Sequence, residues 1–382
     1  MTGDDVRELL RGVVDPELGS DIVDLGMVRS AEVSPDGVVT LEIALTTAGC
    51  PLQHQIDRDV TAKIGSAPGV RDVEITWAEM TAEEKAACMA KARWNATQRA
   101  GSTTIPGTTR VIAVASGKGG VGKSSVTVNL AAGLAAEGFA VGVLDADIGG
   151  FSVPRMLGVE GRLAGVTDEK AKIAPHVKPL GAGRLEIVSM GFLVEDEQSA
   201  LVWRGQMLNR AVQHFFEDVR WGELDYLLID MPPGTGDIQI GLARLIPRAE
   251  MIVVTTPGRG VQAVAARAAD LARKTYLGVA GVIENMSAFT CEHGTTYALF
   301  GEGGGEELAE RVGAPLLGSV PLEPSVALGG DSGTPAVLGD GPAADAFRAI
   351  VRRIVDDVLP PVSMAGCTAR MLDRVEAALG PK

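Results

Sequence analysis

Hydrophobic and polar positions follow two different patterns along the chain. After residue 109, short runs of consecutive apolar residues alternate with segments in which apolar residues recur at helical spacing. Uninterrupted apolar runs are typical of strands that are buried on both faces of a parallel sheet. This alternation predicts an α/β domain with a doubly wound, mostly parallel sheet. We expect its strands at 110–116, 140–147, 185–191, 226–232, 250–256, 277–284 and 314–320, with helices at 123–138 and 206–219.

The residues before this domain predict a small α+β domain. Helical periodicity at 6–14 and 54–65 is combined with strand-like segments at 37–46 and 70–77. A helix rich in Ala, Lys and Glu follows from residue 81, and the segment after it has the composition of a linker. We therefore divide the chain into a small domain at 1–95, a linker at 96–109, a nucleotide-binding domain at 110–360, and a tail with a short helix at 361–382.

A phosphate-binding motif directly follows the strand expected at 110–116. The sequence GKGGVGKSS fits the pattern G-x-x-x-x-G-K-[ST], with Gly117, Gly122, Lys123 and Ser124 at the defining positions. Glycines let backbone N–H groups converge on phosphate oxygens, the lysine neutralises the terminal phosphates, and the serine hydroxyl can bind Mg²⁺. The motif therefore predicts a P-loop site for ATP and Mg²⁺. The loop residues expected to bind ATP are Gly117, Lys118, Gly119, Gly120, Val121, Gly122, Lys123, Ser124 and Ser125.

Aspartates stand at the ends of two further predicted strands. Asp230 ends one strand and is the expected partner of the metal ion. Asp145 and Asp147 end another strand and, being two residues apart, share one side of an extended chain. A carboxylate there can hold the metal or the water that attacks the γ-phosphate, although aspartates also cap strands and turns. We predict Mg²⁺ binding by Ser124, Asp145 and Asp230, and catalytic roles for Lys118, Lys123 and Asp147.

Charge and cysteine content narrow the class of partners. A formal net charge of −14 argues against non-specific attraction to DNA or to an anionic membrane. The chain contains neither an apolar run long enough to span a bilayer nor an N-terminal signal pattern. The cysteines are far apart, which favours reduced thiols or metal ligands over disulfides. We therefore expect a cytoplasmic protein without nucleic-acid or membrane partners; its cysteines are Cys50, Cys88, Cys291 and Cys367.

The phosphate-binding loop has a second lysine, Lys118, directly after its first glycine. In this form, GKGGVGKS, it resembles the loop of the ParA/MinD/nitrogenase iron protein group. That resemblance implies a homodimer that sandwiches ATP, in which Lys118 reaches the nucleotide of the partner. The stretches DADIGGFSVPRMLG, LVWRGQM, LLIDMPPGTGD and VIENMSAFTCEHG are similar to the Mrp/ApbC branch, the iron–sulfur cluster carrier ATPases. In the small domain, VVDPELGSDIVDLGMV and LTTAGCPLQ resemble the SufT/PaaD-like iron–sulfur assembly domain.

The resemblance carries an expectation about function. It implies slow ATP hydrolysis, binding of an iron–sulfur cluster, and delivery of the cluster to recipient apoproteins, with iron–sulfur assembly proteins as further partners. By the same resemblance Asn285 is the expected adenine contact. Two other readings stay open, namely a positioning switch that binds a surface and an ATP-dependent scaffold that does not itself hold a cluster.

Two positions depart from the pattern of the Mrp/ApbC branch. Gly258 stands where that branch commonly has the glutamine of TTPQ. Cys291 is followed by Glu292, His293 and Gly294, whereas well-studied relatives carry C-x-x-C, so that a dimer supplies the four thiolates of a [4Fe–4S] cluster. Cys291 therefore remains a candidate cluster ligand in an altered set and otherwise is an ordinary loop cysteine.

Other side chains are candidates to complete this altered set. His293 is two residues from Cys291, so the two would face the same way on an extended segment, and imidazole can ligate an iron–sulfur centre. Cys50 lies where the resembling assembly domain places a reactive or ligand-supplying cysteine, and its alternative is a small buried residue in a tight turn. Cys367 is a weaker candidate, and Cys88, within an Ala-rich helix, is expected to be structural.

Overall fold

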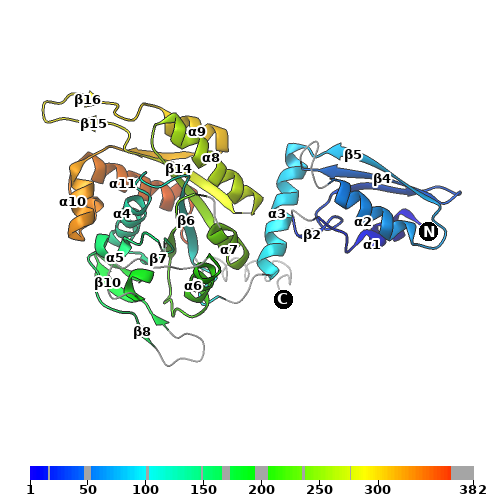
Figure 1. Cartoon of the computed structure of the whole chain (residues 1–382), viewed down its shortest axis with the longest axis horizontal. Coiled ribbons are helices and arrows are strands. Elements are labelled where there is room, and N and C mark those ends of the chain that lie inside the picture. Colours follow the sequence, from blue (N-terminus) through cyan, green and yellow to red (C-terminus); the bar gives the residue numbers. More distant parts are fainter. Residues whose placement is uncertain are drawn as a thin grey trace, which may run out of the picture. The chain divides into compact units, whose positions relative to one another are not determined.

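Two compact units make up the structure, a computed structural model, and the chain divides between them at Ala100 and Gly101 (Figure 1). The described residues are 1–15, 18–46, 53–99, 103–147, 149–165, 173–193, 205–234, 237–275 and 277–362. Cys50, Cys367 and the helix expected near the C-terminus lie outside them. No helix among the described residues is long and apolar enough to cross a membrane.

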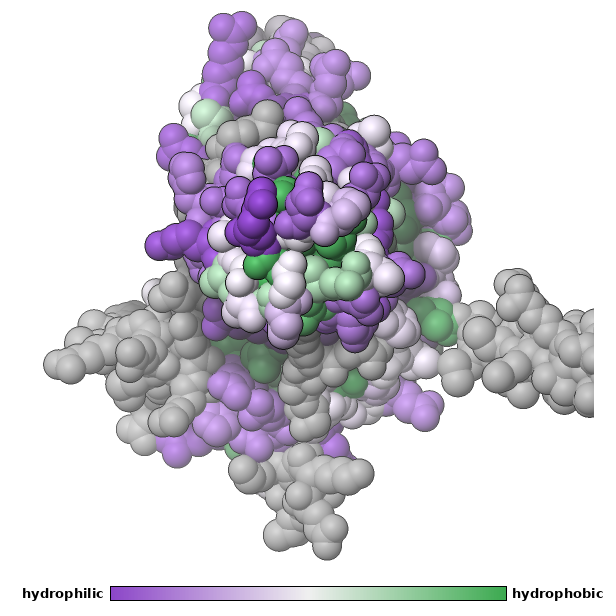
Figure 2. All heavy atoms as spheres, turned by 90° about the vertical axis from the view of Figure 1, so that its right-hand side faces the viewer, coloured by the Kyte–Doolittle hydropathy of each residue, from purple (hydrophilic) through white to green (hydrophobic). Residues whose placement is uncertain are grey.

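The small unit packs helices against a three-stranded sheet. In this sheet β4 (Val38–Leu45) pairs antiparallel with β3 (Val28–Val33) and parallel with β5 (Asp72–Glu79). Its helices are α1 (Gly3–Leu10), α2 (Gln53–Gly65) and α3 (Ala82–Arg99), and a short antiparallel pair joins β1 (Val14–Asp15) to β2 (Ser20–Asp21). Side chains from these elements are fully buried, among them Val6, Leu10, Leu41, Ile43, Ile56 and Ile64. Figure 2 looks onto this unit, whose visible side chains are mainly hydrophilic with scattered apolar ones.

Three features of the small unit differ from the sequence prediction. The helix expected at 6–14 ends at Leu10, because Gly12 adopts a left-handed φ of 90° and the chain then enters β1. Strand β3, whose polar residues are mostly half-buried, was not predicted. Helix α3 continues to Arg99 and thus covers the first residues of the segment expected to be a linker.

The large unit is built on one eight-stranded sheet, which confirms the predicted doubly wound fold. The strand order is β10-β11-β7-β12-β6-β13-β14-β17, and every neighbouring pair is parallel except β10 with β11. The seven expected strands are all present, and β10 is an additional edge strand. Their bounds are β6 (Arg110–Ser116), β7 (Ala140–Asp145), β10 (His176–Leu180), β11 (Gly183–Ser189), β12 (Tyr226–Asp230), β13 (Glu250–Thr255), β14 (Gly278–Asn285) and β17 (Leu316–Val320).

Helices cover both faces of this sheet (Figure 1). One face is packed by α4 (Lys123–Ala136), α5 (Val153–Met156) and α11 (Pro342–Arg353). The other is packed by α6 (Gly205–Glu217), α7 (Asp237–Leu245), α8 (Arg259–Lys274) and α9 (Gly304–Val312). Helix α10 (Pro324–Ser332) packs against α5. Short antiparallel pairs are β8 (Ala164–Gly165) with β9 (Ile173–Ala174) and β15 (Phe289–Thr290) with β16 (Thr296–Tyr297).

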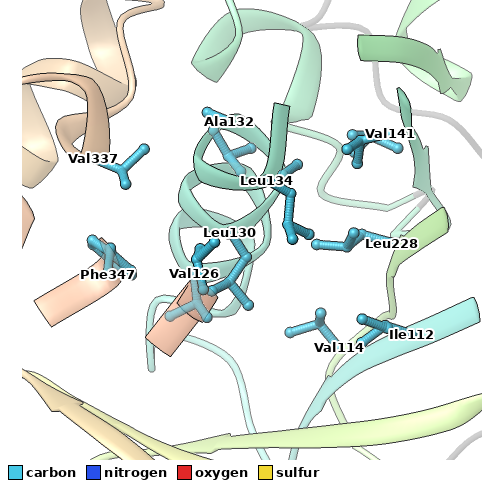
Figure 3. Packing of buried hydrophobic residues seen from close by; sticks show 14 of the residues in the cluster. Ile112, Val114, Val126, Leu130, Ala132, Leu134, Val141, Leu228, Val337 and Phe347 are labelled. Carbon is cyan, nitrogen blue, oxygen red and sulfur yellow. The ribbon is translucent and has the colours of Figure 1, made fainter. Parts of the chain in front are cut away.

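Helix α4 is buried on nearly all sides, which fixes the loop that precedes it. Figure 3 shows Leu130 and Leu134 of α4 between the sheet, which contributes Leu228, and the C-terminal part of the unit, which contributes Phe347. All four side chains are fully buried. Truncating one such leucine to alanine typically costs about 2–5 kcal/mol of stability. The phosphate-binding loop therefore rests on a rigid support.

Candidate functional site

The phosphate-binding loop joins β6, at the centre of the sheet, to the N-terminus of α4. Gly122 has a φ of 80°, and a Cβ there would lie 2.2 Å from Nδ2 of Asn285. A Cβ on Gly117 would lie 2.3 Å from the backbone nitrogen of Ala265 in α8. Both positions therefore require glycine, because a side chain would displace either the loop or the elements packed on it.

Lys123 and Ser124 meet the aspartate at the end of β12. Lys123 is buried, and its Nζ lies 2.7 Å from Oδ1 of Asp230 and 3.7 Å from Oδ2 of Asp147. The Ser124 hydroxyl donates a hydrogen bond of 2.6 Å to the other oxygen of Asp230. Thr127, one turn further along α4, donates to Asp230 as well, at 2.9 Å. The predicted residues Lys123, Ser124, Asp147 and Asp230 are thus brought together, and Thr127 joins them.

Asp145, at the end of β7, is fully buried and holds the start of α5. Its Oδ2 accepts hydrogen bonds from the backbone N–H groups of Ser152 and Val153, at 3.2 and 3.3 Å, and from the hydroxyl of Ser189, at 3.1 Å. In the paired strands β7 and β12, Asp145 stands opposite Asp230. Asp145 is therefore next to the predicted metal site, but its side chain is engaged by α5 and β11.

Burial sets the protonation of these acids. Desolvation, together with the nearby charge of Asp230, raises the pKa of Asp145 to about 7, and Lys123 opposes the shift. Burial also raises the pKa of Asp147, which the adjacent Lys123 partly offsets. The site thus concentrates acidic groups around one buried ammonium, so that a phosphate could replace a carboxylate as the partner of Lys123, and a metal ion could replace the ammonium beside the carboxylates.

A cavity of about 330 Å³ opens beside the loop. Its lining includes the exposed Lys118 and continues from the loop to Asp147, to α5 and to α10. Two contributions to the site were not predicted from the sequence. Thr127 could have been found, since it follows Lys123 by four residues on the same helix, but α10 carries no recognisable motif. The lining residues outside the loop are Ser116, Asp147, Ser152, Arg155, Met156, Pro233, Val326, Ala327, Gly330 and Asp331.

Asn285 connects the phosphate-binding loop to the segment that carries Cys291. It is buried at the end of β14, and its side-chain amide donates a 2.9 Å hydrogen bond to the carbonyl of Val121. The next residue, Met286, has a φ of 56°, a left-handed conformation that is uncommon outside glycine. A strained residue therefore separates the loop contact from the hairpin that follows.

Cys291 lies in the turn between β15 and β16, a hairpin that projects from the body of the large unit (Figure 1). The hairpin turn is closed by a bond from the N–H of Gly294 to the carbonyl of Cys291, at 2.9 Å. Backbone N–H groups of His293 and Thr295 lower the pKa of the Cys291 thiol. The residues after Cys291 are exposed as far as Phe300. The hairpin therefore presents a thiol with increased thiolate character at the surface.

The expected alignment of His293 with Cys291 is wrong. The segment is a tight turn rather than an extended strand, because Gly294 takes a φ of 79°. The His293 ring instead lies 3.7 Å from the carboxylate of Glu292, and both side chains are largely exposed. Among the residues that the structure describes, no three His, Cys, Asp or Glu side chains gather as a metal-binding group.

Neither of the two remaining features is part of the cavity lining. Gly258 caps the start of α8 with an ordinary φ of −64°, and the buried Gln262 donates to the carbonyl of Pro257 at 2.8 Å. In the small unit Cys88 is buried in α3, where desolvation and then Asp15 raise its pKa to about 11. The expectation that Cys88 is structural agrees with this burial.

The comparisons with known proteins cover both units. The family model described as NUBPL iron-transfer P-loop NTPase matches residues 107–355, and a model described as iron-sulfur cluster assembly protein matches residues 3–77. The chain is 45% identical over 346 residues to the iron-sulfur cluster carrier protein of Mycobacterium tuberculosis H37Rv, covering 89% of each chain. It is 44% identical over 358 residues to that of Deinococcus radiodurans, covering 93% of this chain and 95% of the relative.

One solved structure resembles the large unit at an identity that supports comparison. It is a nucleotide-binding protein from Archaeoglobus fulgidus in complex with ADP, 34% identical, with a TM-score of 0.52. The likeness covers 67% of this chain and 96% of that chain.

Proposed function

Since the chain belongs to the family of NUBPL-type iron-transfer P-loop NTPases, we propose that it is an ATP-hydrolysing carrier, active as a homodimer, that holds an iron–sulfur cluster and transfers it to apoproteins. The family match confirms the resemblance inferred from the loop and from the motifs around Asn285. The observation that carries the proposal is that the nucleotide site and the Cys291 segment are connected within the large unit. A P-loop with a buried lysine–carboxylate cluster is bonded through Asn285 to the segment that leads to Cys291.

We assign the chemistry of hydrolysis to residues at the ends of β7 and β12 and in the loop. Lys123 would exchange its bond to Asp230 for the phosphates of ATP, since both are anionic partners for the same ammonium. Asp147, whose pKa is raised by burial, would orient the attacking water and receive its proton. Lys118, exposed at the cavity, would reach the nucleotide of a second copy in the dimer.

The residues at this site also fit Mg²⁺. Mg²⁺ prefers oxygen ligands, and the Ser124 hydroxyl and an Asp230 carboxylate oxygen are 2.6 Å apart beside the loop. We propose that both groups bind the ion. Asp145 would act beside them, because its carboxylate also holds the start of α5. When bound, the ion would supply neutralisation of the charge on the phosphates.

The cluster is the cargo, and we place it at Cys291. Its half-buried thiol has a lowered pKa, and thiolate is the form that binds iron. Two copies supply two such thiolates, so a [4Fe–4S] cluster would need further ligands from Cys50, Cys367, a small thiol or the recipient. Nucleotide binding at the loop would affect the hairpin through Asn285 and the strained Met286.

The small unit supports a role in cluster assembly. Its match to an iron–sulfur cluster assembly protein suggests that it contacts assembly partners, and Cys50 is its candidate ligand. One observation keeps a second function in view. Within the described residues, the hairpin offers a single cysteine, as would be expected if the protein were an ATP-dependent scaffold that recruits partners without holding a cluster.

Anaerobic reconstitution with iron and sulfide tests the proposal. We expect iron and a visible cluster spectrum in the wild type and loss of both in Cys291→Ala. Cys88→Ala is the matched control, since it removes a buried thiol from the other unit and should leave the iron content unchanged. Loss in Cys50→Ala alone would move the cluster to the small unit. If the wild type held only adventitious iron, the carrier function would be ruled out and the scaffold function would remain.

A further inference from the structure

A third basic side chain, Arg155 of α5, lines the nucleotide cavity in addition to Lys118 and Lys123. It is not part of the phosphate-binding motif. In the structure its guanidinium forms an ion pair with the carboxylate of Asp331, which belongs to α10 and lines the same cavity. An acidic group thus holds a basic one at the edge of the site expected to bind a polyanion.

The backbone places this pair with little freedom. The start of α5 is fixed by the buried carboxylate of Asp145, to which the N–H groups of Ser152 and Val153 donate. Just after their C-terminal ends, α5 and α10 meet at Gly158 and Gly333. A Cβ on Gly333 would lie only 2.4 Å from the Cα of Gly158. The two helices are therefore docked rigidly, and the side chains of the pair are the parts that can rearrange.

The ion pair itself is open to exchange. The side chain of Arg155 is 46% exposed and that of Asp331 is 74% exposed. Exposed pairs of this kind contribute little to stability, typically about 0–1 kcal/mol. Guanidinium binds phosphate through parallel, charge-assisted hydrogen bonds that are stronger than a solvated pair. Entry of a polyphosphate into the cavity would therefore favour release of Arg155 from Asp331.

We propose that Arg155 binds the terminal phosphate of ATP and thereby favours ATP over ADP, and that Asp331 competes with that phosphate for the guanidinium and so limits this preference. This inference rests on the proposed ATP site. The terminal phosphate is the part of ATP assigned to Arg155 because Arg155 lines the same cavity as Asp147, the residue proposed to orient the attacking water. The α-phosphate and the base lie instead toward the loop and Asn285 in the proposed arrangement.

A neighbouring cavity would change shape when Arg155 exchanges Asp331 for phosphate. A second hollow of about 590 Å³ is lined by Arg155 and Asp331 as well, together with Glu160, Gly191 and Phe192. The ion pair stands on the boundary that the two cavities share. Its opening would join them on the side of α5, so the arrangement of this surface would differ between the ATP-bound and ADP-bound protein.

Nucleotide titration of the full chain tests the proposal. In Arg155→Gln we expect Mg²⁺–ATP to bind about tenfold more weakly, the loss of one charge-assisted contact, and Mg²⁺–ADP to change less than about twofold. In Asp331→Asn we expect ATP to bind several-fold more tightly. Asp270→Asn is the matched control, because Asp270 forms a comparable exposed pair with Lys274 in α8, away from the cavity.

The double variant Arg155→Gln/Asp331→Asn separates competition from simple charge repulsion. If Asp331 acts by holding Arg155, its substitution improves ATP binding only while Arg155 is present. An equal gain in both backgrounds, or equal weakening of ATP and ADP in Arg155→Gln, would overturn the proposal. A wild-type protein that binds no ATP would instead overturn the proposed ATPase itself. The titration distinguishes this outcome from one in which the wild type binds ATP and Arg155→Gln binds it with the same affinity.

Discussion

Where α4 meets the end of β12, the charged side chains are buried and bonded to one another, whereas at the Cys291 hairpin the charged side chains are exposed and carry few contacts. Lys123 and Asp230 are nearly inaccessible and share bonds with Ser124 and Thr127. The hairpin has a short antiparallel pair and a turn that leaves Cys291 at the surface. The first arrangement suits a reaction that needs fixed groups, and the second suits a ligand that must be handed on.

Among the changes considered, removal of Lys123 from the nucleotide site should have the largest effect. Lys123→Ala deletes the only ammonium within bonding distance of Asp230 and Asp147 among the described residues. We expect ATP hydrolysis to fall by about a hundredfold or more, the cost typical of losing one stabilising donor. Phosphate release measures the effect, and Lys274→Ala, on the surface of α8, is the control. Unchanged hydrolysis would show that another site turns over ATP.

The two regions also differed in how far the sequence could predict them. The loop residues and Asp147 and Asp230 were identified correctly as neighbours, because a spacing motif fixes the loop and parallel strands bring their ends to one edge of the sheet. Their roles as ligands and catalysts remain predictions. Arg155 and Asp331 were missed because their proximity depends on how α5 and α10 pack, which no local pattern encodes.

At the hairpin, prediction failed for a local reason. The sequence indicated an extended segment, in which Cys291 and His293 would share a side. Gly294 allows a turn instead, and the turn is favoured by its own closing bond to Cys291. Short segments between strands have several accessible conformations, and a single glycine decides among them.

Thiol reactivity tests the difference between the surface thiol of Cys291 and the buried thiol of Cys88. Backbone N–H groups lower the pKa of Cys291, whereas burial raises that of Cys88 to about 11. At pH 7.5 we therefore expect iodoacetamide to modify Cys291 at least about tenfold faster than Cys88. Peptide mass spectrometry would follow both sites, and the denatured chain, in which their rates should converge, is the control. Similar rates in the folded protein would contradict the assigned environments.

The buried acids of the nucleotide site predict that the stability of the protein depends on pH. Because the folded-state pKa of Asp145, about 7, lies above the ordinary aspartate value of 3.8, the folded state binds the extra proton between those two pH values. Stability from this group is therefore greatest at low pH and is lost as the pH rises toward 7. Between pH 5 and 7.5 the loss is about 2 kcal/mol.

Asp145→Asn should remove this part of the pH dependence. Urea unfolding of the nucleotide-free protein at pH 5 and pH 7.5 would measure it, with the wild type and Asp270→Asn as references. We expect the difference in unfolding free energy between wild type and Asp145→Asn to change by about 2 kcal/mol across this range, while Asp270→Asn follows the wild type. A difference that does not vary with pH would mean that Asp145 is already ionised at pH 5 in the folded protein.

The smallest effect is expected for His293. Its ring contacts Glu292 rather than standing beside Cys291, and both side chains are exposed. His293→Ala should therefore leave the iron content of the reconstituted protein unchanged, in contrast to Cys291→Ala. Iron analysis and the visible spectrum of the two variants, prepared in parallel, make the comparison. Loss of iron in His293→Ala would show that the turn opens on cluster binding and that the imidazole completes the ligand set, so the hairpin would then be a site that forms only with its cargo.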